Sequence, residues 1–407
     1  MAQRLCRLSP TLRRTFATKA AHIEVSGTRY ATDAATNVTR AILDKVPRRL
    51  YKIPNHPIGI LSSLISSHFA RSGKFATIDP PSPVVSVAKN FDELGFAADH
   101  PGRSASDSYY LNADTLLRTH SSAHEIETFS NPAVRDAWLL TADVYRRDEI
   151  DRSHYPVFHQ MEGAKLYDIS TDIAAVESQL DAREKALNAA NVAILDDTRI
   201  SSSNPFQASH DPVLAQLVLR DLKLSINELI VSLFGSLRHS REDDAALQVR
   251  WIEAFFPFTS PSYEVEVFWN GEWLELLGTG VIQQRTLDAA GVDNKVGWAF
   301  GLGLERIAMV LFGIPDIRLF WSEDQRFLAQ FTAGKISTFK PHSKYPQIAR
   351  DTSFWIPAGV HANDFCDIVR DVAGDLVEDV KLVDEFVHPK TQRASVTYRV
   401  TYRSMDR

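Results

Sequence analysis

Residues 143–163 carry side chains that could hold a charged, flat ligand. Both ends of this stretch have strand-like patterns, and its middle, 148–155, is charged. Because strand side chains alternate between faces, Phe158, Gln160 and Glu162 are predicted to share one face. On the preceding strand, Arg146 and Asp148 are predicted to share a face as well. A cation, an aromatic plane, an amide and a carboxylate could together hold a phosphate, a base and an ammonium group. An ordinary charged hairpin at a sheet edge explains this stretch equally well.

A second stretch, 296–312, has a glycine-rich turn before a helical pattern. Gly301 and Gly303 would let a ligand approach the backbone closely. Arg306 falls in the first turn of the predicted helix, 304–312, where a cation opposes the helix dipole. A bound polyphosphate would explain that arginine, whereas a simple turn before a core helix would not.

A third group of polar residues stands in or beside short predicted elements. The strands 263–269 and 273–277 are joined by Asn270-Gly271, a strong hairpin signal. Trp273, Glu275 and Leu277 are predicted to share a face, where a carboxylate is unusual unless it binds something.

Ser122 and Glu125 have the spacing of a capping box, which predicts a helix from Ala123. The alternative is that the turn from His120 to Ser122 presents an imidazole and hydroxyls to a ligand. On this segment alone the capping interpretation is preferred.

The remaining patterns supply the elements that would position these residues. The helical patterns cover 33–46, 57–69, 173–190 and 212–234, and strand patterns cover 84–87, 108–111 and 249–254. Residues 332–345 read as an interdomain linker. The order strand, helix, strand, strand over 352–402 begins a ferredoxin-like βαββαβ domain whose last helix and strand are missing.

Composition bounds the location and the chemistry. A length of 407 residues predicts two or more domains. Before Glu24 there are five Arg or Lys, several hydroxyl residues and no acid, which is typical of a mitochondrial transit peptide, predicted over residues 1–22. No apolar run is long enough to cross a membrane. The two cysteines, Cys6 and Cys366, exclude a disulfide framework and a cysteine zinc site.

Together the motifs resemble those of phenylalanyl-tRNA synthetases, specifically the short single-chain mitochondrial form, from about residue 25 to the end. Two of them match general class II synthetase motifs, the strand–loop–strand at Arg146–Asp148 and the Gly-Leu-Gly-Leu-Glu-Arg at Gly301–Arg306. Three others point to phenylalanine: Arg118–Ser122, Phe158–Glu162 and Phe255–Phe258.

This resemblance implies an α+β fold. It predicts a class II antiparallel-sheet catalytic domain with flanking helices over 23–331, the linker 332–345, and an incomplete ferredoxin-like anticodon-binding domain over 346–407. It implies ATP-dependent activation of L-phenylalanine and its transfer to the 2′-hydroxyl of the terminal adenosine of tRNA(Phe). A monomer in the mitochondrial matrix, with Mg²⁺ and without zinc or a membrane partner, is expected.

The resemblance also implies a role for each candidate residue. Arg146 and Arg306 would bind the α- and γ-phosphates of ATP, and Phe158 would stack on adenine. Asp148 and His154 would help to hold the nucleotide, and Asp148 stands where the class often has Glu. The phenylalanine site would comprise His120, Ser122, Gln160, Glu162, Phe256, Phe258 and Ala299, with the two phenylalanines packing against the substrate ring and Ala299 at the pocket floor. Glu275 is the candidate magnesium ligand.

Two other functions remain open at this point. A non-catalytic synthetase paralogue that binds tRNA would usually lose the phosphate-binding arginines, and here Arg146 and Arg306 are both present. A related ligase that adenylates another carboxylate is the second alternative. The Phe256 and Phe258 pair, with Gln160 and Glu162, favours an aromatic amino acid.

Overall fold

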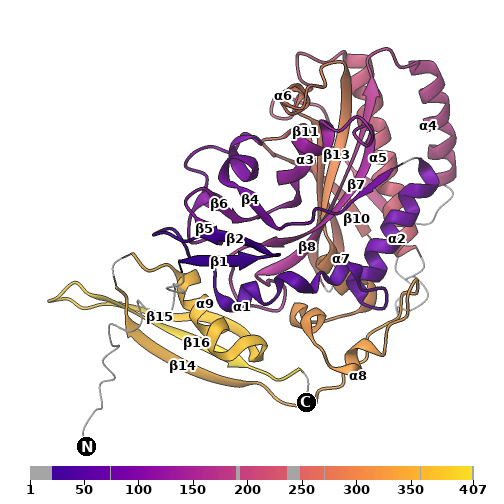
Figure 1. The fold of residues 1–407 in the computed structure, drawn as a ribbon. Coiled ribbons are helices and arrows are strands. Elements are labelled where there is room, and N and C mark those ends of the chain that lie inside the picture. The colour runs from indigo at the N-terminus through magenta and orange to yellow at the C-terminus, as the bar shows by residue number, and fades with distance from the viewer. Residues whose placement is uncertain are drawn as a thin grey trace, which may run out of the picture.

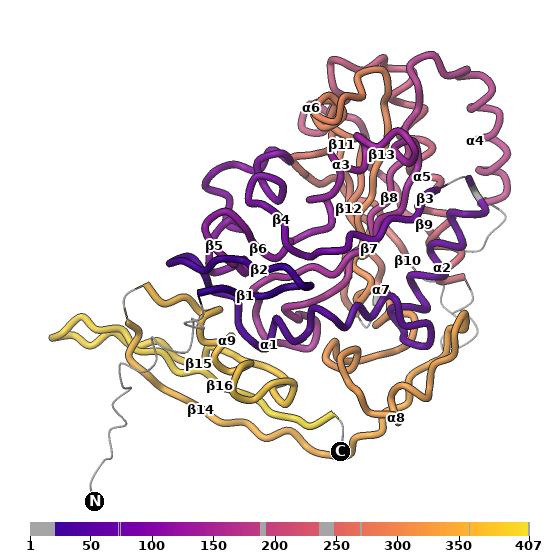
Figure 2. The backbone as a smooth tube through the Cα atoms, viewed as in Figure 1, coloured from indigo at the N-terminus to yellow at the C-terminus, as the bar shows by residue number. Residues whose placement is uncertain are grey.

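An eight-stranded sheet forms the centre of the larger domain, in the order β3-β7-β8-β13-β12-β11-β10-β9 (Figures 1 and 2). The computed structural model describes residues 21–73, 75–188, 193–235, 248–269, 271–357 and 359–405. All neighbouring strands are antiparallel except the outermost pairs, β3 with β7 and β9 with β10. The strands are β3 Ala76–Ile78, β7 Ala137–Tyr145, β8 Val157–Asp168, β9 Ala193–Asp196, β10 Gln248–Ala254, β11 Thr259–Trp269, β12 Glu272–Ile282 and β13 Lys295–Gly303.

Long helices cover one face of this sheet. The helix α5, Pro212–Phe234, packs on β12 and β13, and α4, Ile173–Asn188, lies outside it. The helices α2, Pro57–Ser72, and α7, Leu304–Phe312, pack on each other beside α5, as Figure 1 shows. Among the described residues no helix is long and apolar enough to span a bilayer.

Shorter elements surround the sheet and leave the middle of its opposite face open. These elements are β1 His22–Val25, β2 Thr28–Ala31, α1 Arg40–Leu43, β4 Val84–Ser86, β5 Tyr110–Asn112, β6 Thr115–Leu117, α3 Glu125–Phe129 and α6 Gln284–Ala289. Apart from its last two residues, the predicted transit peptide, 1–22, lies outside the described residues.

The C-terminal domain has the predicted strand, helix, strand, strand order. It comprises β14 Ile348–Trp355, α9 Ala362–Ala373, β15 Val377–Val387 and β16 Ala394–Tyr402. The sheet order is β14-β16-β15, the order expected for the first three strands of a ferredoxin-like sheet. Among the described residues, β14 has no strand on its outer edge.

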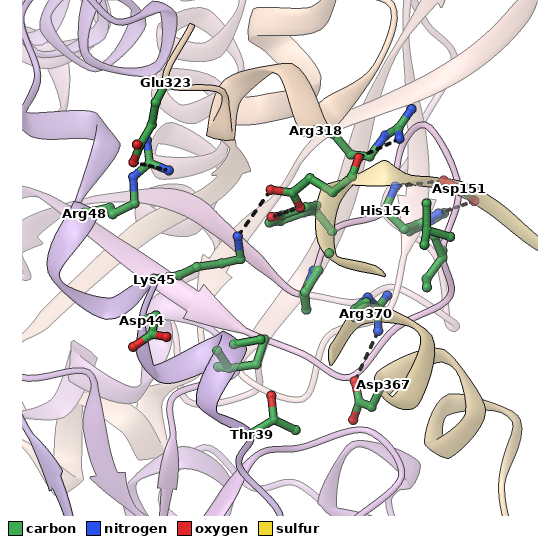
Figure 3. Close-up of a pocket in the computed structure, with 18 residues that line it drawn as sticks. Thr39, Asp44, Lys45, Arg48, Asp151, His154, Arg318, Glu323, Asp367 and Arg370 are labelled. Atoms are coloured by element: carbon green, nitrogen blue, oxygen red, sulfur yellow. Dashed lines mark hydrogen bonds and ion pairs between the residues drawn. The ribbon is translucent and has the colours of Figure 1, made fainter. Parts of the chain in front are cut away.

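The C-terminal domain contacts the loop between β7 and β8. Arg147 Nε donates to the Asp367 carboxylate at 2.6 Å, and the Val380 N–H donates to the Ile150 carbonyl at 3.0 Å. A pocket of about 310 Å³ lies at this junction, and Figure 3 shows side chains of both domains around it. The linker is also anchored, because Phe339 is buried and its N–H donates to the Phe312 carbonyl at 2.7 Å.

The helix predicted over 33–46 is wrong for most of its length. Only α1, at 40–43, is α-helical, and a 3₁₀ turn follows at 46–48. The preceding residues form a loop because their short polar side chains bond to backbone groups: Asp33 accepts from the Ala35 N–H, and Asn37 bonds to Ala105 and Tyr110. Such side chains offer the backbone an alternative to helical hydrogen bonds.

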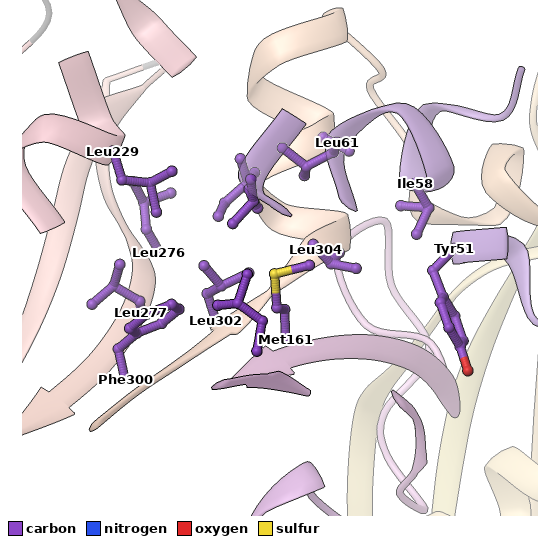
Figure 4. Packing of buried hydrophobic residues seen from close by; sticks show 14 of the residues in the cluster. Tyr51, Ile58, Leu61, Met161, Leu229, Leu276, Leu277, Phe300, Leu302 and Leu304 are labelled. Atoms are coloured by element: carbon purple, nitrogen blue, oxygen red, sulfur yellow. The ribbon is translucent and has the colours of Figure 1, made fainter. Parts of the chain in front are cut away.

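The core lies between the sheet and its covering helices. Met161 of β8 sits near Leu304 of α7 and Leu302 of β13, while Leu276 and Leu277 of β12 point toward Leu229 of α5 (Figure 4). All of these side chains are buried. This dense packing holds the strands in place on the helix-covered face of the sheet. Their opposite face is therefore available for polar side chains.

One buried carboxylate ties α5 to the back of the sheet. Asp221 of α5 accepts from Trp298 Nε1 at 2.7 Å, from the Tyr167 hydroxyl at 2.7 Å and from Lys165 Nζ at 2.9 Å, and it also pairs with Arg183. Burial alone would raise its pKa, but the charges of Lys165 and Arg183 hold the pKa below its usual value. The carboxylate is therefore ionised and satisfied.

We expect Asp221→Ala to lower the free energy of unfolding by about 3–5 kcal/mol, because it leaves buried donors and cations without their acceptor. Asp181→Ala is the matched control, since Asp181 forms an exposed ion pair with Arg220 whose loss should cost less than about 1 kcal/mol. Denaturant titration measures both. Equal losses in the two variants would contradict this role of Asp221.

Candidate active site

Two adjoining pockets lie on the open face of the large sheet. The first encloses about 280 Å³ and the second about 350 Å³. They share Arg146, Gln160, Glu275 and Gly301 in their linings. A ligand with two chemically different ends could therefore occupy both, and the shared residues would lie at the junction of those ends.

The strand register explains why the two pockets are open. Gln160 of β8 lies opposite Gly303 of β13, and Glu162 lies opposite Gly301. Opposite residues in an antiparallel pair point to the same face. The side chains of β8 therefore stand next to backbone that carries none, which leaves room above β13.

Arg146 lies one residue beyond the end of β7, so the predicted strand face that it shares with Asp148 is not formed. Its Nε donates to the Thr119 carbonyl at 2.8 Å, and its guanidinium carbon lies 5.2 Å from the centre of the Phe158 ring. This contact fixes the guanidinium beside an aromatic plane. An anion and a flat ring could be held side by side at this point.

Arg306 enters the first pocket from α7. The preceding residue, Glu305, is buried and accepts from the His159 backbone N–H at 2.9 Å and from His159 Nδ1 at 2.6 Å. Because adjacent helical residues point in different directions, this inward anchor leaves Arg306 free to face the pocket, where its Nη1 donates to Glu275 at 3.1 Å.

A bulge in β12 corrects the predicted strand face of Glu275. Glu275 pairs with Glu266 and Leu277 pairs with Val265, so Leu276 is an extra residue between them. The extra residue breaks the alternation. Leu277 therefore joins the core, whereas Glu275 turns to the pocket face.

Glu275 belongs to a set of carboxylates on neighbouring strands. Glu264 and Glu266 alternate along β11 on the same face. Burial, followed by the charges of Glu275 and Glu266, raises the pKa of Glu264. Of the charges near this set, Arg306 pairs with Glu275 and Arg250 with Glu266. Such oxygen donors suit a hard divalent cation.

The remaining residues predicted for the first pocket lie in or near the β7–β8 loop. Asp148 and His154 both line it. His154 Nδ1 lies 2.7 Å from the Asp151 carboxylate, and this hydrogen bond raises the pKa of His154. The imidazole is thus biased toward its charged form, which suits an anionic ligand.

Gln160 and Glu162 are held by the turn that contains Ser121 and Ser122. The Ser121 N–H donates to Gln160 Oε1 at 3.0 Å, and the Ser122 hydroxyl donates to Glu162 Oε1. The hydroxyl of Ser122 is therefore used by Glu162. The helix predicted here is present as α3, but its start at Ala123 and its cap at Ser122 are wrong, because a 3₁₀ turn, Ser121–His124, comes first and α3 begins at Glu125.

Glu162 is an unusual carboxyl group. It is 5% exposed, and its Oε2 is buried without a hydrogen-bond partner among the described residues. Burial raises the pKa of Glu162 to about 7. Glu125, also buried, lines the same pocket, and burial together with the charge of Glu162 raises the pKa of Glu125 well above its usual value. Glu162 is therefore the one that ionises first.

His120 is a neutral group in this pocket. Burial, followed by the charge of Arg146, lowers the pKa of His120 to about 3. Its Nε2 lies 2.8 Å from the Asn90 carbonyl, and its ring stacks on Phe96 at 5.5 Å between ring centres. Because Nε2 must donate to that carbonyl, the neutral ring leaves Nδ1 as a hydrogen-bond acceptor that does not repel a cation.

The apolar part of the second pocket is made by aromatic rings and small residues. Phe256 and Phe258 lie with ring centres 5.8 Å apart and planes 12° from parallel. Gly278 makes room for Phe256, because a Cβ at that position would come within 2.7 Å of the ring. Ala299, 7% exposed, lines the pocket beside them.

Every predicted site residue lines one of the two pockets. Sequence reasoning missed Phe96, His100 and Thr279 in the second pocket, and it assigned Glu125 only a capping role. Phe96 and His100 come from an irregular segment without a periodic pattern. The one signal for Glu125 would have been an acidic residue in a segment predicted to be buried, because buried acids are rare.

Comparison with known protein families matches both parts of the chain. Residues 42–181 and 203–331 match the model "tRNA synthetases class II core domain (F)". Residues 343–407 match the "Ferredoxin-fold anticodon binding domain". The first match alone covers more than half of the chain.

Similar proteins span almost the whole sequence. The mitochondrial phenylalanine–tRNA ligase of Saccharomyces cerevisiae is 46% identical, over 96% of this chain and 90% of that protein. The mitochondrial enzyme of Mus musculus is 44% identical, over 95% of this chain and 83% of its own. The chloroplastic/mitochondrial enzyme of Arabidopsis thaliana is 42% identical, over 92% of this chain and 77% of that protein.

The expected fold class and family are thus confirmed. With its class II core, its ferredoxin-fold C-terminal domain and this degree of identity, the chain belongs to the mitochondrial phenylalanine–tRNA ligase family.

Proposed function

We propose that this protein activates L-phenylalanine with ATP and transfers the phenylalanyl group to the 2′-hydroxyl of the terminal adenosine of tRNA(Phe) in the mitochondrial matrix. The observation that carries this proposal is the junction of the two pockets at Arg146 and Gln160. An amino acid in one pocket would there present its carboxylate to the α-phosphate of a nucleotide in the other.

ATP would occupy the first pocket. Adenine would stack on Phe158, Arg146 would hold the α-phosphate, and Arg306 would hold the γ-phosphate. Asp148 and His154 line the same pocket and would help to hold the nucleotide. Guanidinium groups suit this task because they bind phosphate oxygens in two-point contacts.

Phenylalanine would occupy the second pocket. Its ammonium group would bind the free oxygen of Glu162, which has no other partner among the described residues. Gln160 would offer its amide NH₂, since its oxygen already accepts from Ser121. His120 and Ser122 complete the polar end, while Phe256, Phe258 and Ala299 would enclose the ring.

Glu275 would be a ligand of Mg²⁺. No group of three or more acidic, His or Cys side chains that could hold a metal occurs among the described residues, so the phosphates of ATP and water would supply the other ligands. Bound Mg²⁺ would offset negative charge on the phosphates. The protein residues themselves position the two reactants.

The chemistry requires no nucleophile from the protein. A carboxylate oxygen of phenylalanine attacks the α-phosphorus, a P–O bond forms, and the bond to the leaving pyrophosphate breaks. Arg146 stabilises the charge that develops on the phosphoryl oxygens. In the second step the ribose hydroxyl attacks the carbonyl carbon and an ester bond forms. The bond from that carbon to the phosphate oxygen breaks, and AMP leaves after its phosphate takes up the hydroxyl proton. Pyrophosphate exchange with a panel of amino acids tests this function, and activation of phenylalanine alone is expected.

We expect Arg306→Ala to reduce phenylalanine-dependent ATP–pyrophosphate exchange by about 100-fold or more, because a charge-stabilising contact is lost. The protein should remain folded, since the side chain of Arg306 is partly exposed and, within the described part of the chain, its ion pair is with Glu275. Arg220→Ala, on the outer face of α5, is the control and should retain normal exchange. Near-normal exchange by Arg306→Ala would refute its assignment.

We expect Ala299→Gly to admit p-chlorophenylalanine, because removing the methyl group deepens the floor of the ring pocket. A change of this size is worth about 1–3 kcal/mol in discrimination. Ala164→Gly is the matched control: Ala164 lies directly opposite Ala299 on β8 but lines neither pocket. Exchange rates with both amino acids measure the change, and unchanged selectivity would count against this floor.

We expect kcat/KM for phenylalanine to fall as pH drops below about 7, since protonated Glu162 cannot pair with the substrate ammonium group. Glu162→Gln should remove this pH limb and raise KM. Glu125→Gln should keep the midpoint near 7, because burial rather than Glu125 raises the pKa of Glu162. A pH profile of wild-type protein that is flat from 6 to 8 would contradict this role.

A further inference from the structure

Arg118 lines neither pocket, although it begins the motif Arg118–Ser122. It is fully buried, at 0% exposure, and directly follows the last residue of β6. Its backbone extends the pairing of β4 with β6, because the Arg118 N–H donates to the Pro83 carbonyl at 2.9 Å. A charged side chain is seldom buried without partners that require it, so the contacts of Arg118 indicate what it holds in place.

The guanidinium of Arg118 is anchored to β7 through Asp143. Its Nε donates to the Asp143 backbone carbonyl at 2.6 Å, and its Nη2 donates to the Asp143 carboxylate at 2.7 Å. Burial alone would raise the pKa of Asp143, but the charge of Arg118 and the hydrogen bond from the Tyr145 hydroxyl hold that pKa below its usual value. The pair is therefore ionised, and two contacts from one rigid plane fix the orientation of the guanidinium.

The remaining nitrogen of the same guanidinium reaches the far end of the turn. Arg118 Nη1 donates to the Ser82 carbonyl at 2.9 Å and to His124 Nε2 at 3.0 Å. Because Nε2 accepts, His124 Nδ1 carries the ring proton and donates to Glu127. Residues 118–124, which we call the closed loop, are thus held at both ends by one side chain, just before α3 begins.

The closed loop presents backbone and hydroxyl groups to both pockets. Each of three contacts joins a group of the closed loop to a residue that lines a pocket. The Thr119 carbonyl accepts from Arg146 Nε at 2.8 Å, the Ser121 N–H donates to Gln160 Oε1 at 3.0 Å, and the Ser122 hydroxyl donates to Glu162 Oε1. One short segment therefore orients the arginine of the first pocket together with two polar groups of the second.

We propose that Arg118 is a positioning residue of the activation step. By joining Asp143 to His124, it sets the closed loop in the conformation that orients Arg146 for the nucleotide and Glu162 for the ammonium group. This inference rests on the proposed function, because both of those roles belong to that reaction. Lysine could not replace Arg118, since an ammonium group lacks the planar fork that reaches Asp143 and His124 together.

The first variant, Arg118→Lys, keeps a charge beside Asp143 and removes the fork. We expect kcat/KM for phenylalanine in pyrophosphate exchange to fall by about 10- to 100-fold, with a higher KM, because small displacements of binding groups are costly in catalysis. Arg183→Lys is the matched control, since Arg183 of α4 also holds a buried carboxylate, Asp221, and lines neither pocket. Its KM should equal that of the wild type even if its melting temperature falls.

A pKa measurement separates positioning from a general loss of structure. Burial raises the pKa of Glu162 to about 7, and the hydrogen bonds from Ser122 oppose that rise. Loosening the closed loop weakens these bonds, so the pKa of Glu162 should move above 7 in Arg118→Lys. Partial unfolding would instead reduce activity without that shift. The other titratable groups that line this pocket, all unchanged in the variant, are His100, His120, Glu125, Arg146 and Glu275.

A ¹³C-NMR titration of the Glu162 carboxyl group in ligand-free protein measures this pKa, with the signal assigned by its absence in Glu162→Gln. Variants of His124 test the bridge even if Arg118→Lys does not fold. His124→Leu removes the acceptor for Nη1 and leaves the ion pair of Arg118 with Asp143 in place. It should raise both the KM and the pKa of Glu162. His124→Gln keeps an acceptor and should restore both toward their wild-type values.

The outcomes distinguish the two proposals. A wild-type KM and an unchanged pKa of Glu162 in Arg118→Lys and His124→Leu would overturn the positioning role, as would equal effects in Arg183→Lys. Equal effects of His124→Leu and His124→Gln would also overturn it. Absence of phenylalanine-dependent exchange in the wild type would refute the proposed function alone, because the titration of Glu162 needs no substrate and still decides the role of Arg118.

Discussion

The site depends on one buried contact between β8 and α7. Glu305 holds both the backbone N–H and the ring of His159, and both side chains are almost fully buried. Because strand side chains alternate, fixing His159 toward the core fixes Phe158 and Gln160 toward the pockets. On α7 the same contact leaves the next residue, Arg306, at the pocket. Two segments more than a hundred residues apart are thereby aligned by one carboxylate.

Much of this site could be predicted because strand side chains alternate between the two faces of a sheet. The prediction failed where a bulge interrupts that alternation. The face shared by Phe158, Gln160 and Glu162 follows from period two, and it is confirmed because all three side chains line the two pockets. Glu275 faces the pocket because of a bulge at Leu276, and no local sequence pattern predicts that bulge. Ser122 shows a different limit: its spacing predicts a cap, and only the fold brings Glu162 within reach of its hydroxyl.

Long helices were predicted best, because burial and propensity agree there. The predicted range 212–234 is the observed extent of α5, whereas 33–46 failed where side-chain hydrogen bonds replaced helical ones. The C-terminal strand order followed from the sequence of element types. The partners of the pocket carboxylates could not be predicted from the sequence, because only the tertiary fold brings Glu125 near Glu162.

Successive residues of the β7–β8 loop contact different parts of the protein. Arg146 and Asp148 line the nucleotide pocket, whereas Arg147 between them pairs with Asp364 and Asp367 of α9. A buried arginine with two carboxylates resists displacement, because separating them would leave charges without partners. Three consecutive residues cannot move independently over such a short length. This loop therefore joins the nucleotide pocket to the C-terminal domain through neighbouring residues of one short segment.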